Sequence, residues 1–112
     1  MPQITSPTEA QTVITSFEVS PGTAQDLMDK LVATYKAFIR HQPGFIGAGL
    51  HINDAQTRIA NSSQWARRED FLAMLRLDEM RAYNREFQAL CRSFEPVLYD
   101  VVHVTEGGVV GS

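Results

Sequence analysis

The side chains best suited to chemistry lie on two short segments near the middle of the chain, residues 45–53 and 57–66. His51 could remove a proton near neutral pH, because the ordinary pKa of histidine is about 6.5. The amide of Asn61 could hydrogen-bond an oxyanion forming on a substrate, and the indole of Trp65 could stack on aromatic rings. Together these residues predict a ligand site with a base, a hydrogen-bond donor and an aromatic surface.

The two segments are predicted to pair as a hairpin, so their register decides whether these side chains meet. With an odd number of loop residues, the pairs are His51 with Ile59, Gly49 with Asn61, Gly47 with Ser63, and Phe45 with Trp65. The two glycines would then form the floor of a hollow, because a strand glycine lacks a side chain to fill the space. His51, Asn61 and Trp65 would surround this hollow. A slip of one residue would put the glycines on the opposite face from Asn61 and Trp65.

Each of these residues also has an ordinary structural interpretation. A single histidine on a strand is commonly a hydrogen-bonded structural residue. Asn61 stands in mid-strand, where asparagine is depleted, yet it could merely satisfy a neighbouring backbone group. Trp65 could belong to the core.

Length and composition indicate one small globular domain. The 112 residues are 44% hydrophobic and 21% charged, with a net charge of −3, which is too apolar for a disordered chain. The acidic balance argues against binding to nucleic acid or to an anionic membrane surface. No apolar run reaches the roughly 18 residues of a membrane span.

The first residues and the cysteine content indicate a cytoplasmic location. Met1 to Glu9 lack the layout of a signal peptide. Cys91 is the only cysteine, so no internal disulfide can form. It falls in an apolar helical stripe, where we expect an inert core thiol.

The hydrophobic pattern predicts the order βαββαβ. The expected elements are a strand at 13–19, a helix of about 18 residues from Ala24, strands at 45–53 and 57–66, a broken helix at 67–75 and from Asp78, and a strand at 97–105. This order is typical of an α+β, ferredoxin-like fold with an antiparallel sheet and helices on one face. The bare face needs a cover, and a second copy is the simplest one. We expect the domain to span 12–105, between mobile tails at 1–11 and 106–112.

Three short motifs resemble one known family. Gln42-Pro43-Gly44-Phe45 opens the second strand, Asn61-Ser62-Ser63-Gln64-Trp65 closes the third, and Arg68-Glu69-Asp70-Phe71 follows. With these motifs the chain resembles the antibiotic biosynthesis monooxygenase domains, from Thr12 to about Thr105. Those domains are dimeric α+β barrels. The members it resembles oxidise aromatic polyketides, anthrones and quinols with molecular oxygen, without flavin, haem or metal.

The resemblance implies roles for particular residues. Asn61 and Trp65 would line the cavity, together with His51 on the second strand and Arg85 on the long second helix. By spacing alone, however, Arg85 falls on a solvated helix face. The expected substrate contacts are Phe45, Gly47, Gly49, Ser63, Phe71 and Tyr83.

One departure from the family pattern concerns the proton relay. The anthrone oxygenases have a tyrosine six residues after the tryptophan, where this chain has Phe71. Tyr35, Tyr83 or Tyr99 could supply the missing hydroxyl. The family also contains haem-degrading members, which need an asparagine on the first strand and an axial histidine on the second helical segment. Residues 13–19 contain no asparagine and residues 67–94 contain no histidine, so haem degradation is not expected here.

The expected function is therefore a cofactor-independent monooxygenase that converts a polycyclic anthrone or quinol into a quinone with molecular oxygen, acting as a homodimer. Two alternatives remain open at this point. One is a non-oxidative cyclase, isomerase or accessory ligand-binding protein of the same kind of pathway, which the missing hydroxyl at Phe71 favours. The other is a purely structural or small-ligand-binding dimer. The histidines show no metal-ligand spacing.

Overall fold

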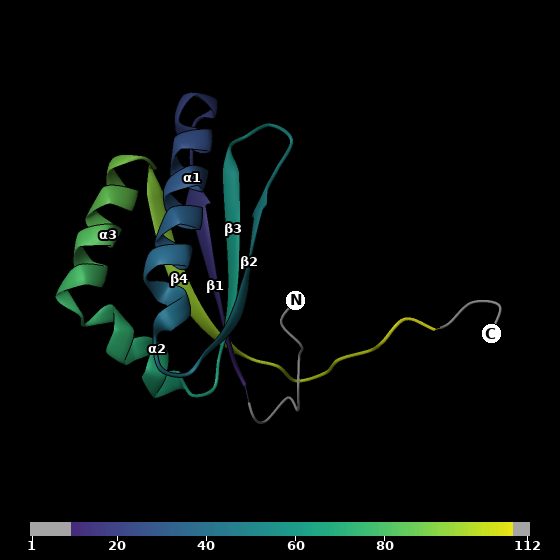
Figure 1. Cartoon of the computed structure of the whole chain (residues 1–112). Coiled ribbons are helices and arrows are strands. Elements are labelled where there is room, and N and C mark those ends of the chain that lie inside the picture. The colour runs from purple at the N-terminus through teal and green to yellow at the C-terminus, as the bar shows by residue number, and fades with distance from the viewer. Residues whose placement is uncertain (1–9, 109–112) are drawn as a thin grey trace.

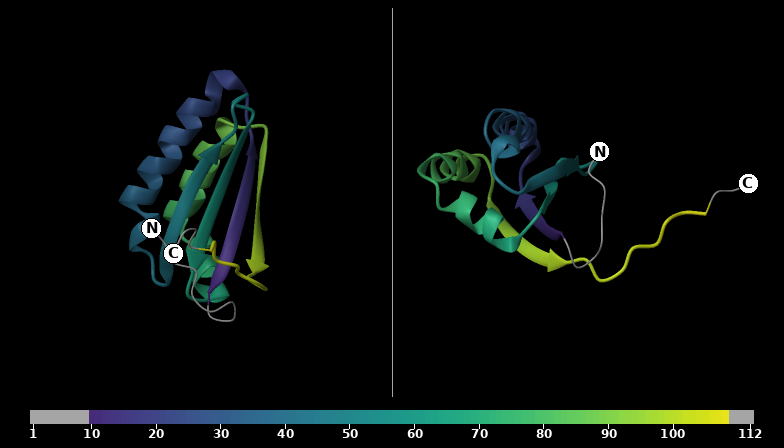
Figure 2. Two further views of the ribbon diagram at one scale, coloured as in Figure 1. Left: turned by 90° about the vertical axis from the view of Figure 1, so that its right-hand side faces the viewer. Right: turned by 60° about the horizontal axis from the view of Figure 1, so that its bottom comes forward.

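The computed structural model describes residues 10–108, so most of both predicted tails lies outside the described residues. The elements are β1 (Gln11–Glu18), α1 (Pro21–Ala37), the short 3-10 helix η1 (Ile39–His41), β2 (Phe45–Ile52), β3 (Arg58–Trp65), α2 (Arg68–Leu75), α3 (Asp78–Ala89) and β4 (Ser93–Asp100). The strands form one antiparallel sheet in the order β2-β3-β1-β4 (Figure 1). The helices cover one face of the sheet and leave the other bare (Figure 2). The predicted ferredoxin-like α+β fold is confirmed.

The first strand and helix follow from their hydrophobic periods. In β1 the buried residues Val13, Thr15 and Phe17 alternate with exposed ones, as period two requires. In α1 the buried residues recur at helical spacing, at Ala24, Leu27, Leu31 and Thr34. The helix begins at Pro21 rather than Ala24, because proline suits a first helical turn.

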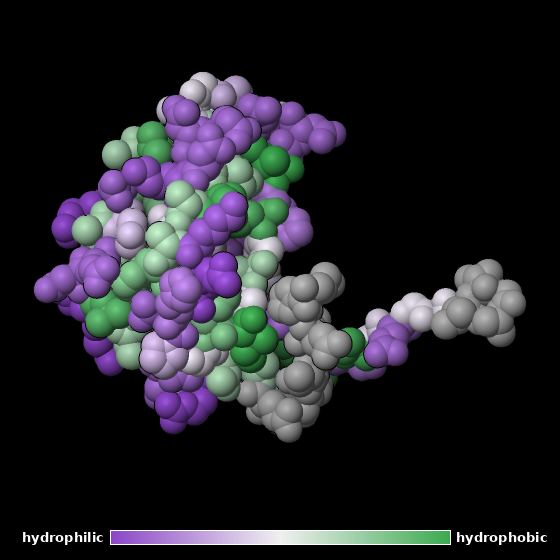
Figure 3. Space-filling view, viewed as in Figure 1, coloured by the Kyte–Doolittle hydropathy of each residue, from purple (hydrophilic) through white to green (hydrophobic). Residues whose placement is uncertain are grey.

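The core lies between the sheet and the helices. The Phe17 ring stacks on Phe94 of β4 with centroids 5.1 Å apart, and meets Phe87 of α3 edge-on at 6.4 Å. The outer surface of the helices is mostly hydrophilic (Figure 3). In the described part of the chain, no helix is long and apolar enough to cross a membrane.

The last strand differs from its prediction. β4 spans Ser93–Asp100 rather than 97–105, and α3 ends at Ala89. Phe94 therefore belongs to the strand. Pro96 lies inside it, opposite Thr15. A proline is tolerated here because β4 is an edge strand, where a missing N–H can face the free side. From β4 the chain continues to residue 108 without regular structure and extends away from the body (Figure 1).

The start of the sheet also differs slightly from the prediction. Gln11, assigned to the N-terminal tail, is the first residue of β1 and pairs with Trp65 and Asp100. Its side-chain amide donates a 2.8 Å hydrogen bond to the Asp100 carboxylate. The ordered sheet thus begins one residue inside the predicted tail.

The hairpin register is shifted by one residue from the prediction. Ile52 pairs with Ile59, Leu50 with Asn61, and Ala48 with Ser63. Gly47, Gly49 and His51 therefore point away from the face that carries Asn61, and the predicted glycine hollow beside Asn61 is wrong.

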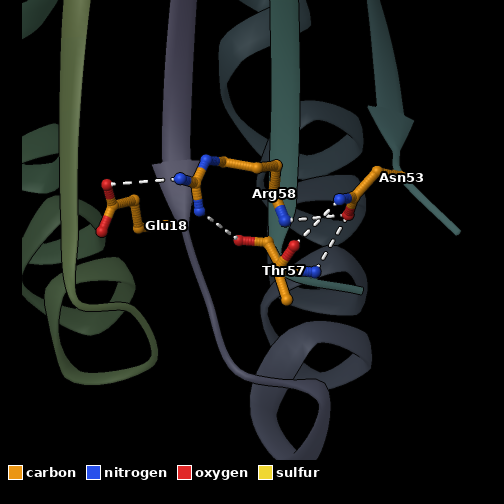
Figure 4. Close-up of polar contacts among 4 residues, drawn as sticks. All are labelled: Glu18, Asn53, Thr57 and Arg58. Carbon is orange, nitrogen blue, oxygen red and sulfur yellow. Dashed lines mark hydrogen bonds and ion pairs between the residues drawn. The ribbon is translucent and has the colours of Figure 1, made fainter. Parts of the chain in front are cut away.

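The cause of the shift is the loop between β2 and β3. The Asn53 amide N–H donates to the Arg58 carbonyl, so an even number of residues, 54–57, closes the turn. The Asn53 side chain holds this turn: its Oδ1 accepts from the backbone N–H groups of Thr57 and Arg58, each at 2.9 Å (Figure 4). Arg58 also reaches Glu18 on β1, with 3.7 Å between Nη2 and Oε1.

A bulge between Phe45 and Gly47 shifts the register by one residue at the other end of the hairpin, which restores the predicted pairing there. One extra residue in β2 turns Phe45 back onto the helix-covered side, opposite Trp65 as predicted. The Phe45 and Trp65 rings meet edge-on, with centroids 5.3 Å apart. Ile46 is left exposed instead.

Candidate active site

One interior cavity lies between the sheet and the helices. Its volume is about 50 Å³. Its polar lining consists of Thr15, Tyr35, Asn61, Ser63, Trp65 and Asn84, and the rest is apolar, including Phe71. Strands β1, β3 and β4 thus supply the floor, while α1, η1, α2 and α3 supply the cover. The cavity would hold a few water molecules, so a ligand of several fused rings would require the helices to move outward.

Asn61 is the best-placed polar group of this cavity. It lies on β3 between Thr15 of β1 and Leu50 of β2, and it is 8% exposed. The Tyr35 hydroxyl, from α1, donates a 2.9 Å hydrogen bond to Asn61 Oδ1. Within the described chain, Asn61 Nδ2 makes no hydrogen bond, so its two donors are left for a ligand.

Trp65 lines the cavity and is 1% exposed. Its Nε1–H donates a 3.1 Å hydrogen bond to Ser63 Oγ, two residues earlier on the same face of β3. Phe45 and Phe71 pack edge-on against the indole, Phe71 with its centroid at 5.6 Å. The indole is therefore held rigidly as an aromatic wall, and its one N–H group has a hydrogen-bond partner.

Tyr35 is the only ionisable side chain among the described residues that line the cavity. Burial raises the pKa of its phenol above the ordinary value, and contacts with Asn61 and Ser63 offset part of this rise. The phenol therefore stays protonated at neutral pH and acts as a hydrogen-bond donor.

The structure separates His51 from the rest of the predicted site. His51 is exposed on the bare face of the sheet, where a Cβ added to Gly49 would lie 3.3 Å from His51 Nε2. Gly49 thus makes room for the imidazole and not for a ligand beside Asn61. His51 cannot act as a base in the cavity of its own protomer, because the sheet lies between them.

Other predicted residues also lie outside the cavity lining. Arg85 is exposed on α3, as its spacing indicated, and Tyr83 packs on Phe38 with ring centroids 5.5 Å apart. Tyr99 is 48% exposed on the outer face of the sheet. Of the three tyrosines that could replace the absent hydroxyl at Phe71, only Tyr35 reaches the cavity.

The predicted site omitted Thr15 and Asn84. Thr15 is a polar residue on the apolar face of β1, between Val13 and Phe17. Threonine is common in strands, so it stands out less than Asn61. Asn84 shares a helix face with the buried residues Met80 and Phe87, four and three residues away. Both could have been found by searching buried faces for polar residues.

A groove lies beside the cavity, between α1 and β2. Its volume is about 260 Å³, and it is lined by Val32, Tyr35, Lys36, Arg40, Phe45, Ala48 and Leu50. Tyr35 lines both spaces, so its ring forms part of the wall between them. In the described residues, no group of three or more His, Cys, Asp or Glu side chains could hold a metal ion.

The sequence comparison agrees with this arrangement of fold and cavity. The family model for the antibiotic biosynthesis monooxygenases matches residues 10–86. The chain belongs to this family. Tetracenomycin-F1 monooxygenase of Streptomyces glaucescens is 29% identical over 92 residues, which cover 82% of this chain and 81% of that enzyme.

Solved structures of family members share the fold. A mutant of SnoaB, a cofactor-independent oxygenase from Streptomyces nogalater, has a TM-score of 0.71 at 20% identity and covers 93% of this chain and 99% of its own. A monooxygenase from Streptomyces coelicolor, in complex with nanaomycin D, has a TM-score of 0.71 at 22% identity and covers 96% of each chain. The resemblance expected from the three motifs is therefore confirmed.

Proposed function

We propose that this member of the antibiotic biosynthesis monooxygenase family is a cofactor-independent oxygenase that converts an anthrone or quinol into a quinone. The observation that carries the proposal is the interior cavity in which Asn61 and Trp65 meet. The two N–H donors of Asn61 have no partner among residues 10–108, and the rigid indole of Trp65 offers an aromatic wall. Family membership and the relatives that are named as oxygenases support it.

The substrate would enter the site as its conjugate anion. No carboxylate or imidazole occurs among the described residues of the cavity lining, so the proton leaves to water. Asn61 Nδ2 then hydrogen-bonds the phenolate or enolate oxygen, which lowers the pKa of the bound substrate. Desolvation and stacking on Trp65 hold the ring system in place for reaction.

The substrate anion would supply the electrons. It transfers one electron to oxygen, and the resulting radical pair combines to form a carbon–oxygen bond and a peroxide anion. After protonation, the carbon that carries the hydroperoxide loses its remaining hydrogen as a proton, so that a C=O bond forms while the O–O bond breaks and water leaves. One oxygen atom ends in the quinone made from an anthrone, or in the hydroxylated quinone made from a quinol, and the other ends in water, while the substrate gives up four electrons to O₂.

A second copy of the chain is the proposed cover for the bare face of the sheet. That face exposes Ile14, Val97 and Tyr99 by 37%, 37% and 48%. These large side chains lie together, since Ile14 pairs with Val97 and Thr12 with Tyr99. Analytical ultracentrifugation should find a dimer, and the variant Ile14→Asp should shift it toward monomer.

Oxygen consumption tests the catalytic proposal directly. Chelator-treated protein is mixed with a panel of anthrones and naphthoquinols, oxygen uptake is followed with an electrode, and the quinone is identified by its absorbance. Trp65 is the only tryptophan, so quenching of its fluorescence reports binding separately. Uptake above the uncatalysed rate is expected. Quenching without oxygen uptake anywhere in the panel would contradict the proposal.

A non-oxidative cyclase, isomerase or accessory binding protein is the second candidate. It is favoured by Phe71, which lines the cavity without a hydroxyl, and by the lack of an ionisable side chain other than Tyr35 among the described lining residues. Such a protein would bind an aromatic polyketide and leave its oxidation state unchanged under oxygen, which mass spectrometry of the recovered ligand would establish.

A further inference from the structure

We infer that Tyr35 is the positioning residue of this site, and that its hydroxyl turns the Asn61 amide so that Nδ2, rather than Oδ1, faces a bound anion. The inference rests on the proposed function for its ligand, an aromatic phenolate or enolate. It assigns a role to a helix residue outside the motifs that link this chain to its family.

In the structure, the hydrogen bond between the two side chains runs from the phenol to the amide oxygen. The Tyr35 oxygen lies 2.9 Å from Asn61 Oδ1. A carbonyl oxygen can only accept, so the phenol must be the donor. Burial raises the pKa of Tyr35, which keeps the proton on the phenol throughout the neutral range.

This direction matters because the two ends of an amide act oppositely on an anion. An N–H group attracts an oxyanion, whereas a carbonyl oxygen repels it. A side-chain amide without a partner can turn about its terminal torsion and present either end. With Oδ1 held by Tyr35, the two N–H donors of Asn61 are the atoms left for the cavity, and no reorientation is needed when the anion forms.

The surroundings fit a dedicated role for this hydroxyl. Tyr35 is the only ionisable side chain among the described lining residues, and it comes from α1, whereas Asn61 comes from β3. The Tyr35 ring packs on Phe45 with centroids 5.9 Å apart and forms the wall toward the groove. Tyr35→Phe therefore removes the hydroxyl alone, whereas an alanine would open that wall.

A nitronaphthol tests this inference without turnover. It ionises near neutral pH and changes colour when it does so. We expect the wild-type protein to lower the pKa of the bound probe, so that the anion binds about tenfold more tightly than the neutral form. Tyr35→Phe should abolish that preference, and Asn61→Ala should do the same. The double variant should match Asn61→Ala, because Tyr35 acts only through Asn61.

The side-chain amide signals of Asn61 in an ¹⁵N-labelled protein give a readout that needs no ligand. In the wild type the two protons should each give a sharp signal at one position, because the hydrogen bond from Tyr35 to Oδ1 fixes the amide. In Tyr35→Phe we expect these signals to shift and broaden as the amide turns, with the backbone spectrum otherwise retained. Tyr99→Phe removes a hydroxyl on the far side of the sheet from the cavity and serves as the matched control. Both readouts should be unchanged, with the oligomeric state checked by ultracentrifugation because Tyr99 lies on the proposed dimer face.

The outcomes separate this inference from the proposed function. If Tyr35→Phe leaves the Asn61 amide signals and the anion preference unchanged, the positioning role is overturned, whatever the enzyme does to anthrones. If the amide signals change in the variant while the wild type neither binds the probe nor oxidises any anthrone, the positioning role stands and the proposed function is overturned.

Discussion

Gly44 is the residue whose replacement the structure predicts most sharply. It belongs to the motif that opens β2, directly before Phe45, and it lies against Asp70, which belongs to the motif at the start of α2. Its φ of +82° lies in the left-handed region. A Cβ built there would lie 2.1 Å from Asp70 Oδ2 and 2.7 Å from Asp70 Cβ. Rotating the Asp70 side chain could relieve the first contact but not the second, because Cβ is fixed by the backbone.

The cost of Gly44→Ala follows from these two features. The left-handed φ costs a non-glycine residue about 1–2 kcal/mol. The forced contact with Asp70 costs about 1–3 kcal/mol, as overpacking of a close contact does elsewhere. We therefore expect the variant to lower the free energy of unfolding by about 2–5 kcal/mol. Urea denaturation followed by the fluorescence of Trp65, which is 1% exposed, measures this directly.

The two contributions can be separated in a double-mutant cycle. In an Asp70→Gly background the contact disappears, so Gly44→Ala should cost only the ~1–2 kcal/mol of the backbone conformation. Gly22→Ala is the matched control, because nothing lies within 4 Å of its added Cβ and it occupies the first turn of α1. A cost of Gly44→Ala below about 0.5 kcal/mol, or an equal cost in both backgrounds, would refute the steric reasoning.

Three further outcomes follow from the site and its surroundings. Asn61→Asp keeps an acceptor for Tyr35 but removes both N–H donors, so oxygen uptake with an anthrone should fall by about 10²–10³-fold with circular dichroism unchanged. Burial raises the pKa of Tyr35 in the folded protein. Below pH ~10, the ordinary pKa of tyrosine, the phenol is neutral in both the folded and the unfolded chain, and the free energy of unfolding is at its full value. Above that pH the unfolded chain loses the proton first, so the free energy of unfolding falls until the phenol of the folded protein also ionises. Urea denaturation between pH 8 and 11 should show this loss in the wild type and less of it in Tyr35→Phe. Burial also raises the pKa of the half-buried Cys91 thiol, so iodoacetamide should alkylate it more slowly in the folded protein than in urea, as mass spectrometry would show.

The element order and most of the faces could be predicted from periodicity. Alternation identified the buried side of β1, and helical spacing identified the buried side of α1, which carries Ala24, Leu27 and Leu31. These signals are local, because each reports how one element lies against a core. The family resemblance also pointed to Asn61 and Trp65, which the structure places in the cavity lining. The alternation along β3 alone did not say which of its faces the helices cover.

The pairing of β2 with β3 could not be predicted in the same way. It depends on the number of loop residues, which the Asn53 side chain determines through two backbone hydrogen bonds, and on an extra residue at the start of β2. A one-residue error reversed the side assigned to His51 and both glycines, while the bulge left Phe45 on the predicted side.

The position of the last strand and the role of Tyr35 were also beyond local pattern. A proline usually ends a strand, and only the edge position of β4 shows why Pro96 is accepted. Tyr35 was one of three tyrosines that could reach the site, and choosing among them requires the packing of α1 on β3. Contacts between distant elements decide such questions.

Pro96 also determines which border of the sheet another chain could extend. A strand added alongside β4 would find no backbone donor at that residue, so a continuous ladder could not form there. The opposite border, β2, contains no proline between Phe45 and Ile52 and offers an unbroken row of donors and acceptors beyond its bulge. Any growth of the sheet into a larger ribbon, whether in normal assembly or in aggregation, is thereby directed to the β2 side.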